Sequence, residues 1–323
     1  MRILEVMECI RNQRTYITGR LPVSALCVLC GWHHNSHVPT LEKLKITLEM
    51  IKFEHTIFAL PFALIGALLA SNGIPSAWQL TWIIAAMVAG RSAAMTFNRI
   101  VDFRYDRLNP RTDKRALPAG TLSFSFAIVF TILMAALFVF SAGQLNRICL
   151  YLSFPTLAIL LFYSYTKRFT AWSHLVLGLA IGLAPLAAWL AIRGEFDWPP
   201  VLLSAAVSFW VAGFDVIYAL QDMEFDRTHR LFSLPARLGA ARALMLSTLF
   251  HAATVLLLLA TALWTELGVI AYAGIAMVTG ILFWEHQIVK PDDLSRVNVA
   301  FFSLNGYVSL LLLISFATDI LTR

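Results

Sequence analysis

The sequence predicts an all-α fold, a polytopic membrane bundle of nine transmembrane helices. Of its 323 residues, 59% are hydrophobic and only 14% are charged, and the mean hydropathy is +0.73. This composition is far too apolar for a soluble globular protein. A stretch of about 20 mostly apolar residues crosses the hydrocarbon of a bilayer as a helix. Nine such stretches occur, at about 51–71, 78–98, 122–142, 148–166, 172–192, 200–220, 241–264, 267–285 and 298–318.

The distribution of lysine and arginine predicts how these helices are oriented. Basic residues concentrate in the cytoplasmic connections of membrane proteins, and here all but four of the 25 fall on the side of the N-terminus. We therefore expect a multi-pass protein of the inner (plasma) membrane, with a cytoplasmic N-terminus and a functional site on the cytoplasmic side. The net charge of +6 then reflects topology in the lipid bilayer, and we expect no nucleic-acid partner. The four exceptions are Arg91 inside the second span and Arg147, Arg193 and Arg323 on the other side.

The first forty residues lie outside the apolar pattern. We expect residues 1–40 to form a poorly structured cytoplasmic extension and residues 41–323 to form the membrane domain. The stretch "CVLCGWHHNSH" contains possible zinc ligands, but structural zinc sites usually separate two ligand pairs by a dozen or more residues. The compact spacing therefore argues against zinc. The ligands in question are Cys27, Cys30, His33, His34 and His37.

Two polar clusters stand where the second and sixth spans end. In "NRIVDFRYDRLNP", Asn98, Asp102 and Asp106 recur every four residues, a spacing that places them on one face of a helix. In "DVIYALQDMEFDR", the spacings of three, four and four predict the same arrangement for a second set. Interfacial anchoring predicts scattered charges, mostly lysine and arginine, and does not predict carboxylates in phase twice. The second set is Asp215, Tyr218, Asp222 and Asp226.

Stacked carboxylates with an asparagine amide oxygen are hard ligands that suit Mg²⁺, which commonly binds one or two carboxylates together with substrate phosphates. Two such clusters facing each other would hold Mg²⁺ ions between them, and a diphosphate would be the natural guest. Basic residues nearby would complete the site by binding the phosphate oxygens. The candidates are Arg111, Arg115 and Lys167.

Arg91 is unusual because it lies within a predicted span. A charged side chain inside a membrane is costly and by default indicates a functional site. It precedes Asn98 by seven residues, two helical turns, and lies deeper in the membrane. We expect it to bind the carboxylate of a second substrate, although a salt bridge to a neighbouring aspartate would also explain it.

These motifs resemble the signatures of the UbiA superfamily of intramembrane aromatic prenyltransferases. The first cluster followed by "NPRTDKRALPAG" is similar to the first family signature, and the second cluster is similar to the second, D-x2-Y-x3-D-x3-D. "FYSYTKRF" matches the family's Tyr-x3-Lys segment and "GRSAAMTFN" its arginine before the asparagine. The resemblance covers residues 51–323. It implies a helical bundle around a central cavity that opens to lipid, and the transfer of a polyprenyl group from its diphosphate to an aromatic ring.

The resemblance also implies roles for individual residues. The catalytic residues would be Asp102, Asp106, Asp222, Asp226 and Lys167, and the Mg²⁺ ligands would be Asn98 and the same four aspartates. Substrate contacts would come from Arg91, Asn98, Arg111, Arg115, Tyr163, Asp215 and Tyr218, with Tyr163 and Lys167 at the diphosphate and Arg91 at the acceptor. One position departs from the family pattern: Arg99 stands where many members have an aspartate, which removes an acidic ligand.

The function we expect is Mg²⁺-dependent prenylation of an aromatic acid in quinone biosynthesis. The partners would be a polyprenyl diphosphate and a 4-hydroxybenzoate-type acceptor, with a dihydroxynaphthoate of menaquinone biosynthesis as a close second candidate. The small residues at 92–95, with Ala212 and Gly213, would leave room for the larger ring. An ion-coupled transporter or lipid-binding membrane protein stays open as a different class of function, and so does a prenyltransferase with a non-aromatic acceptor.

Overall fold

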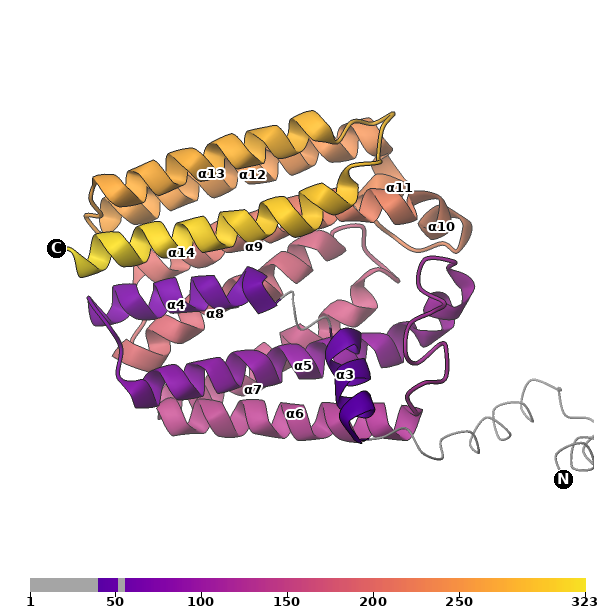
Figure 1. Cartoon of the computed structure of the whole chain (residues 1–323), viewed down its shortest axis with the longest axis horizontal. Helices are drawn as coiled ribbons and strands as arrows, with labels where there is room; N and C mark the ends of the chain where they lie inside the picture. Colours follow the sequence, from indigo (N-terminus) through magenta and orange to yellow (C-terminus); the bar gives the residue numbers. More distant parts are fainter. Residues whose placement is uncertain (1–39, 52–55) are drawn as a thin grey trace, which may run out of the picture.

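The computed structural model describes residues 40–51 and 56–323 (Figure 1). Within these ranges the chain is helical or forms connecting loops, with one isolated bridge between Lys290 and Asp293. The predicted all-α membrane bundle is confirmed. The candidate zinc ligands and most of the N-terminal extension lie outside the described residues.

A helix coincides with each of the predicted apolar stretches. Short additional helices precede the first of them and connect the sixth to the seventh. In chain order the elements are α3 (Thr40–Met50), α4 (Thr56–Ser71), α5 (Ala77–Leu108), α6 (Phe124–Leu145), α7 (Arg147–Thr166), α8 (Ser173–Arg193), α9 (Trp198–Ala219), the 3₁₀ turn η3 (Leu220–Asp222), α10 (Met223–Thr228), α11 (Leu234–Leu238), α12 (Ala240–Trp264), α13 (Val269–Ile288), the π-helix η4 (Val299–Leu304) and α14 (Asn305–Leu321).

Among the described residues, eight helices are long and apolar enough to cross a membrane, and they belong to a multi-pass integral membrane protein. The ninth predicted span corresponds to α4, whose apolar part, Phe58–Ser71, is shorter. The residues just before it, 52–55, lie outside the described ranges. The first of the nine predicted spans, and with it the count of nine, therefore stays a prediction.

α9 is the central helix of the bundle. It packs closely against α8 and α12, and most of its length is buried. Figure 1 shows α12, α13 and α14 on one side of this centre and α5, α6 and α7 on the other. α4 lies against both α8 and α14 and so connects the two groups. α9 therefore has one side toward α8 and another toward α12.

Two glycines allow the close approach of α8 and α9. Gly178 and Gly182 are four residues apart on α8, the small-residue spacing that lets membrane helices pack closely. A Cβ added at Gly178 would overlap the backbone carbonyl of Ser208 on α9, and one at Gly182 would overlap the Ser208 hydroxyl. Because dispersion contacts hold such helices together in lipid, this close packing fixes where α9 lies relative to α8.

α5 carries the first polar cluster beyond the apolar region. It begins at a capping box between Ser76 and Gln79 and runs for 32 residues, about 48 Å at 1.5 Å per residue. This exceeds the roughly 30 Å of a bilayer's hydrocarbon, so the helix continues past the predicted end at 98. Its last turns, the loop after it, α10 and α11 lie at the end of the bundle opposite the C-terminus (Figure 1).

We predict that Gly178→Ala destabilises the bundle, because the added methyl group meets backbone rather than a flexible side chain. Overpacking typically costs about 1–3 kcal/mol. Gly280→Ala is the matched control: it also lies within a spanning helix, α13, but nothing lies within 4 Å of its added Cβ, so it should be neutral or slightly stabilising. Thermal unfolding of the purified variants in detergent measures both. Equal unfolding temperatures for the two variants would contradict the packing argument.

Candidate functional site

The first polar cluster lies on the last turns of α5, as predicted. The Asn98 amide donates to Asp102 Oδ2 at 2.9 Å, so side chains four residues apart do share one face. The other oxygen of Asp102 accepts from Arg168 at 3.1 Å. Arg168 follows α7 and also donates to the carbonyls of Val101 and Ser164. It therefore joins the ends of α5 and α7 at this carboxylate.

Asp106 is buried and lies beside two arginines. Its Oδ1 accepts from Arg115 at 2.7 Å, and Arg99 lies 4.0 Å from its Oδ2. The hydroxyl of Thr112 donates to the Asp106 carbonyl at 3.0 Å, so the loop after α5 folds back over the helix end. Arg99, which occupies the position of a missing acidic ligand, thus adds positive charge beside Asp106.

The second cluster does not lie on one continuous helix, and the sequence prediction is wrong on this point. α9 ends at Ala219, and the 3₁₀ turn η3 precedes α10. Each residue of a 3₁₀ helix advances by about 120° instead of about 100°. The turn therefore rotates Asp226 around the axis relative to Asp215 and Tyr218. Asp222 closes the turn and Asp226 lies on α10.

Arg111, in the loop that follows the first cluster, contacts the second cluster. Its guanidinium makes a bidentate contact with the carboxylate of Asp222 and donates to the Tyr218 hydroxyl at 2.8 Å. Asn109 donates to the same carboxylate at 3.0 Å and accepts from the Arg111 backbone N–H. Burial opposes the charge on Arg111, but the bonds to Asp222 outweigh it and raise the pKa of the guanidinium. The loop after α5 is thereby attached to η3 and α9.

Lys167 ends α7 and faces several carboxylates. Its carbonyl accepts from the backbone N–H of Phe232 at 2.7 Å, which ties the loop after α10 to α7. Burial alone would lower the pKa of the ammonium, but four aspartates outweigh it, and the pKa is raised above its ordinary value. Lys167 is therefore a cation at neutral pH. In order of effect, the aspartates are Asp226, Asp215, Asp222 and Asp102.

Within the described residues, Asp226 differs from Asp102, Asp106 and Asp222 because no arginine pairs with it. It is only 2% exposed, and its Oδ2 has no hydrogen-bond partner in the described part of the chain. The Oδ2 of Asp106 likewise lacks a hydrogen-bond donor among those residues. Buried carboxylate oxygens are normally satisfied by donors or by a metal ion. Each cluster therefore has one buried carboxylate oxygen that is open to a donor or to a cation.

Asp215 is held by a histidine that the sequence analysis did not identify. His174 is fully buried on α8, and its Nδ1 lies 2.7 Å from Asp215 Oδ2. Its Nε2 accepts the backbone N–H of Leu234, at the start of α11, at 3.3 Å. Because Nε2 acts as an acceptor, the ring proton resides on Nδ1 and is donated to Asp215. His174 thus orients the Asp215 carboxylate by donating a hydrogen bond to it.

The remaining predicted residues occupy the expected elements. Arg91 is half-buried on α5, two turns before Asn98, and Tyr163 is half-buried one turn before Lys167 on α7. Gly213 does not widen the acceptor side, contrary to our expectation. A Cβ there would overlap the ring of His251 on α12, so the glycine makes room for that ring on the other face of α9.

The donor set is suited to Mg²⁺, although no three His, Cys, Asp or Glu side chains gather closely enough to hold a metal ion within residues 40–51 and 56–323. Carboxylate and amide oxygens are the ligands that Mg²⁺ prefers. In this structure arginines pair with three of the carboxylates, and one oxygen each of Asp106 and Asp226 has no hydrogen-bond partner among the described residues. The residues therefore fit the ion, and the assignment of Asn98 and the four aspartates as its ligands stays a prediction.

Sequence reasoning missed Arg168, His174 and Asn109. In the sequence Arg168 is only one of the charges that set topology, because it follows a span beside Lys167. His174 lies in an apolar helix with no motif around it, so only the structure reveals its partner. Asn109 stands at the start of the stretch "NPRTDKRALPAG", next to a proline, where its amide resembled an ordinary turn residue.

The fold and the site define an integral membrane protein with opposed acidic clusters and basic residues at one end of its bundle. Residues 59–307 match the UbiA prenyltransferase family. The chain belongs to this family.

Named relatives agree with this assignment. The chain is 30% identical over 226 residues to a 4-hydroxybenzoate octaprenyltransferase of Pseudomonas aeruginosa, covering 70% of this chain and 76% of the relative. It resembles the apo structure of a UbiA homolog from Aeropyrum pernix K1, with 38% identity, a TM-score of 0.76, and coverage of 83% and 98% of the two chains. A UbiA homolog from Archaeoglobus fulgidus, solved with GPP and Mg²⁺, shares the fold with a TM-score of 0.68 at 21% identity over 86% and 100%.

Proposed function

We propose that this prenyltransferase transfers a polyprenyl group from its diphosphate to an aromatic acid of the 4-hydroxybenzoate type, with Mg²⁺ as cofactor. The 4-hydroxybenzoate octaprenyltransferase of Pseudomonas aeruginosa supports the acceptor class. The Archaeoglobus fulgidus homolog solved with GPP and Mg²⁺ supports the donor and the ion. A single observation of this chain carries the proposal: Arg111 and Asn109, from the loop that follows the first cluster, both bind the carboxylate of Asp222, and Arg111 also donates to the Tyr218 hydroxyl.

Charge compensation explains how these residues would bind a diphosphate. Arg168, Arg115 and Arg111 each neutralise one aspartate. A guanidinium binds phosphate oxygens with the same bidentate geometry that it uses for carboxylates. When a diphosphate enters with Mg²⁺, the arginines would turn from the carboxylates to the phosphate oxygens and leave the carboxylates to the ion. The total charge of the site then stays balanced.

The reaction follows from the same groups. Bound Mg²⁺ would withdraw charge from the diphosphate. Lys167 and the arginines would stabilise the negative charge that develops on the leaving oxygen as the C–O bond breaks. The electron-rich ring carbon, ortho to the phenolic oxygen, would form a new C–C bond with the allylic carbon. Its ring proton would pass to a carboxylate or to the released diphosphate.

Arg91 is proposed to hold the acceptor's carboxylate. It lies on the helix that carries Asn98, two turns further into the bundle, so it would place the ring inward of the diphosphate. Both 4-hydroxybenzoate and a dihydroxynaphthoate carry that carboxylate. The second ring needs space, and Gly213, which was expected to offer it, instead accommodates His251. This removes one argument for the naphthoate, while the ion-coupled transporter loses its support through the family membership.

The domain organisation and the location are also part of the proposal. We place the active end of the bundle in the cytoplasm, at the inner (plasma) membrane, because the basic residues concentrate there. We assign the activity to residues 41–323. Met50 and Ile51 of the described segment pack with Leu117 and Leu122 of the loop after α5, so this part of the chain supports the site.

The direct test incubates the purified protein with Mg²⁺, a polyprenyl diphosphate and equal concentrations of 4-hydroxybenzoate and a dihydroxynaphthoate. We expect prenylated 4-hydroxybenzoate as the main product. A preference for the naphthoate above about tenfold, or about 1.4 kcal/mol in transition-state binding, would reverse the acceptor assignment. No prenylated product with either acceptor would refute the proposed function.

Asp226→Asn separates a metal-binding role from a structural one. Asp226 makes no ion pair with an arginine among the described residues, and Lys167 keeps Asp215, Asp222 and Asp102 nearby, so the amide replacement should leave the protein folded. We expect turnover to fall by at least about a hundredfold, about 2.7 kcal/mol. Glu224→Gln is the control, because Glu224 lies on the same short helix but is exposed and pairs with the exposed Arg227. An Asp226→Asn variant that keeps more than a tenth of the wild-type rate would contradict a ligand role.

A chain that starts at Leu41 is expected to keep full activity, because the family match begins at residue 59. The measurement compares turnover and bound zinc for the truncated and full-length proteins. Loss of turnover on truncation, or one equivalent of zinc in the full-length protein, would show that residues 1–40 have a role.

A further inference from the structure

A polar network lies buried on the side of α9 that faces away from the two acidic clusters. It contains Trp210 on α9, His251 on α12, Glu285 on α13 and Asn305 at the start of α14. All four are buried, and Glu285 and Asn305 are completely inaccessible. Polar groups inside a membrane bundle are costly and usually functional. None of them belongs to the diphosphate site described above.

Asn305 is the centre of this network. Its Oδ1 accepts the indole N–H of Trp210 at 2.8 Å, and its Nδ2 donates to Glu285 Oε1 at 3.1 Å and to the Ala300 carbonyl at 3.0 Å. An indole nitrogen only donates, so the orientation of the Asn305 amide is fixed. One side chain thereby joins α9, α13 and the π-helix η4.

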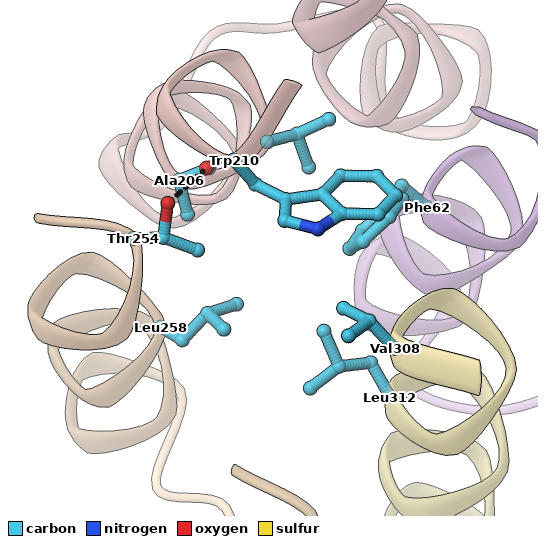
Figure 2. Close-up of a pocket in the computed structure, with 8 residues that line it drawn as sticks. Phe62, Ala206, Trp210, Thr254, Leu258, Val308 and Leu312 are labelled. Carbon is cyan, nitrogen blue, oxygen red and sulfur yellow. Dashed lines mark hydrogen bonds between the residues drawn. The ribbon is translucent and has the colours of Figure 1, made fainter. Parts of the chain in front are cut away.

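The aromatic residue Trp210 connects the network to the apolar core. Figure 2 shows its ring beside Phe62, in a small apolar gap between α4, α9, α12 and α14. The same view shows Thr254 of α12, whose hydroxyl donates to the Ala206 carbonyl of α9 at 3.2 Å. The Thr254 contact links α12 to α9 without reaching η4, which makes it a useful comparison for Asn305.

The π-helix η4 links Asn305 to the end of the bundle that carries the acidic clusters. π-helical turns are rare and frequently occur at functional sites. Here two consecutive residues of η4, Phe301 and Phe302, both contact the ring of Tyr218, with centroids 4.1 and 6.3 Å away. Tyr218 in turn accepts from Arg111 and lies under its guanidinium. A contiguous series of contacts thus runs from Asn305 through η4 to Tyr218 and Arg111.

We propose that Asn305, held by Glu285 and Trp210, is a positioning residue for the prenyl diphosphate site. It fixes the π-helix, the π-helix holds Phe301 against Tyr218, and Tyr218 orients Arg111 between Asp222 and the incoming diphosphate. Glu285 acts as a hydrogen-bond acceptor in this role, so its charge is not required. The inference rests on the proposed function, because it assigns Arg111 to the diphosphate.

The role predicts a selective change in substrate affinity. Asn305→Leu and Phe301→Leu should each raise the KM for the polyprenyl diphosphate about tenfold, and the double variant should not exceed either one, because residues in one series of contacts are coupled. The KM for the aromatic acceptor should not change. Glu285→Gln keeps an oxygen for the Asn305 amide and should retain wild-type values. Thr254→Val is the control for a lost polar contact between membrane helices, and it should leave both KM values unchanged.

The experiment measures both KM values, the thermal unfolding of each variant, and the binding of Mg²⁺ with inorganic pyrophosphate by calorimetry. The proposal is overturned if Asn305→Leu changes only stability, as Thr254→Val does, or raises both KM values equally. If Asn305→Leu does not fold, Phe301→Leu decides, and an unchanged diphosphate KM in that variant overturns the proposal. If the wild-type protein transfers no prenyl group, the proposed function fails and pyrophosphate binding by the variants alone decides this inference.

Discussion

Compensation of buried carboxylates by arginine governs the active end of this protein. Asp102, Asp106 and Asp222 are each paired with an arginine from the loop after α5 or the end of α7, and these pairs join α5, α7, η3 and that loop. A buried carboxylate without a partner is strongly destabilising, by about 3–5 kcal/mol where one member of a pair has been removed. The arginines therefore allow the acidic clusters to exist before any ion is bound. They also bring to the site the groups that recognise phosphate.

The central helix α9 lets one scaffold support two kinds of polar group. Its face toward α8 carries Asp215, oriented by His174, while its other face carries Trp210 and makes room for His251 at Gly213. Tyr218 links the two sides of α9, since it contacts both η4 and Arg111. The close packing of α8 on α9 at two glycines of α8 holds α9 in a fixed position relative to α8.

Much of the architecture follows from local properties of the sequence. Apolar length determines where spans occur, and a four-residue period determines that Asn98 and Asp102 share a face, so both could be predicted. The 3₁₀ turn before α10 could not, because "YALQDMEF" contains no proline or glycine to mark a break. The arginine partners of the carboxylates were equally hidden: Arg111 and Asp222 are 111 residues apart, and only the folded loop brings them together.

The most direct test of this account is the binding of inorganic pyrophosphate to the purified protein by calorimetry, with Mg²⁺ and with the ion removed by a chelator. Asp106 and Asp226 each have a carboxylate oxygen with no hydrogen-bond partner among the described residues, and we propose that these oxygens bind the ion. Pyrophosphate binding should therefore require Mg²⁺ and should be lost in Asp226→Asn while the variant stays folded. Equal affinity with and without Mg²⁺, or unchanged affinity in Asp226→Asn, would contradict the claim that the two acidic clusters form one metal–diphosphate site.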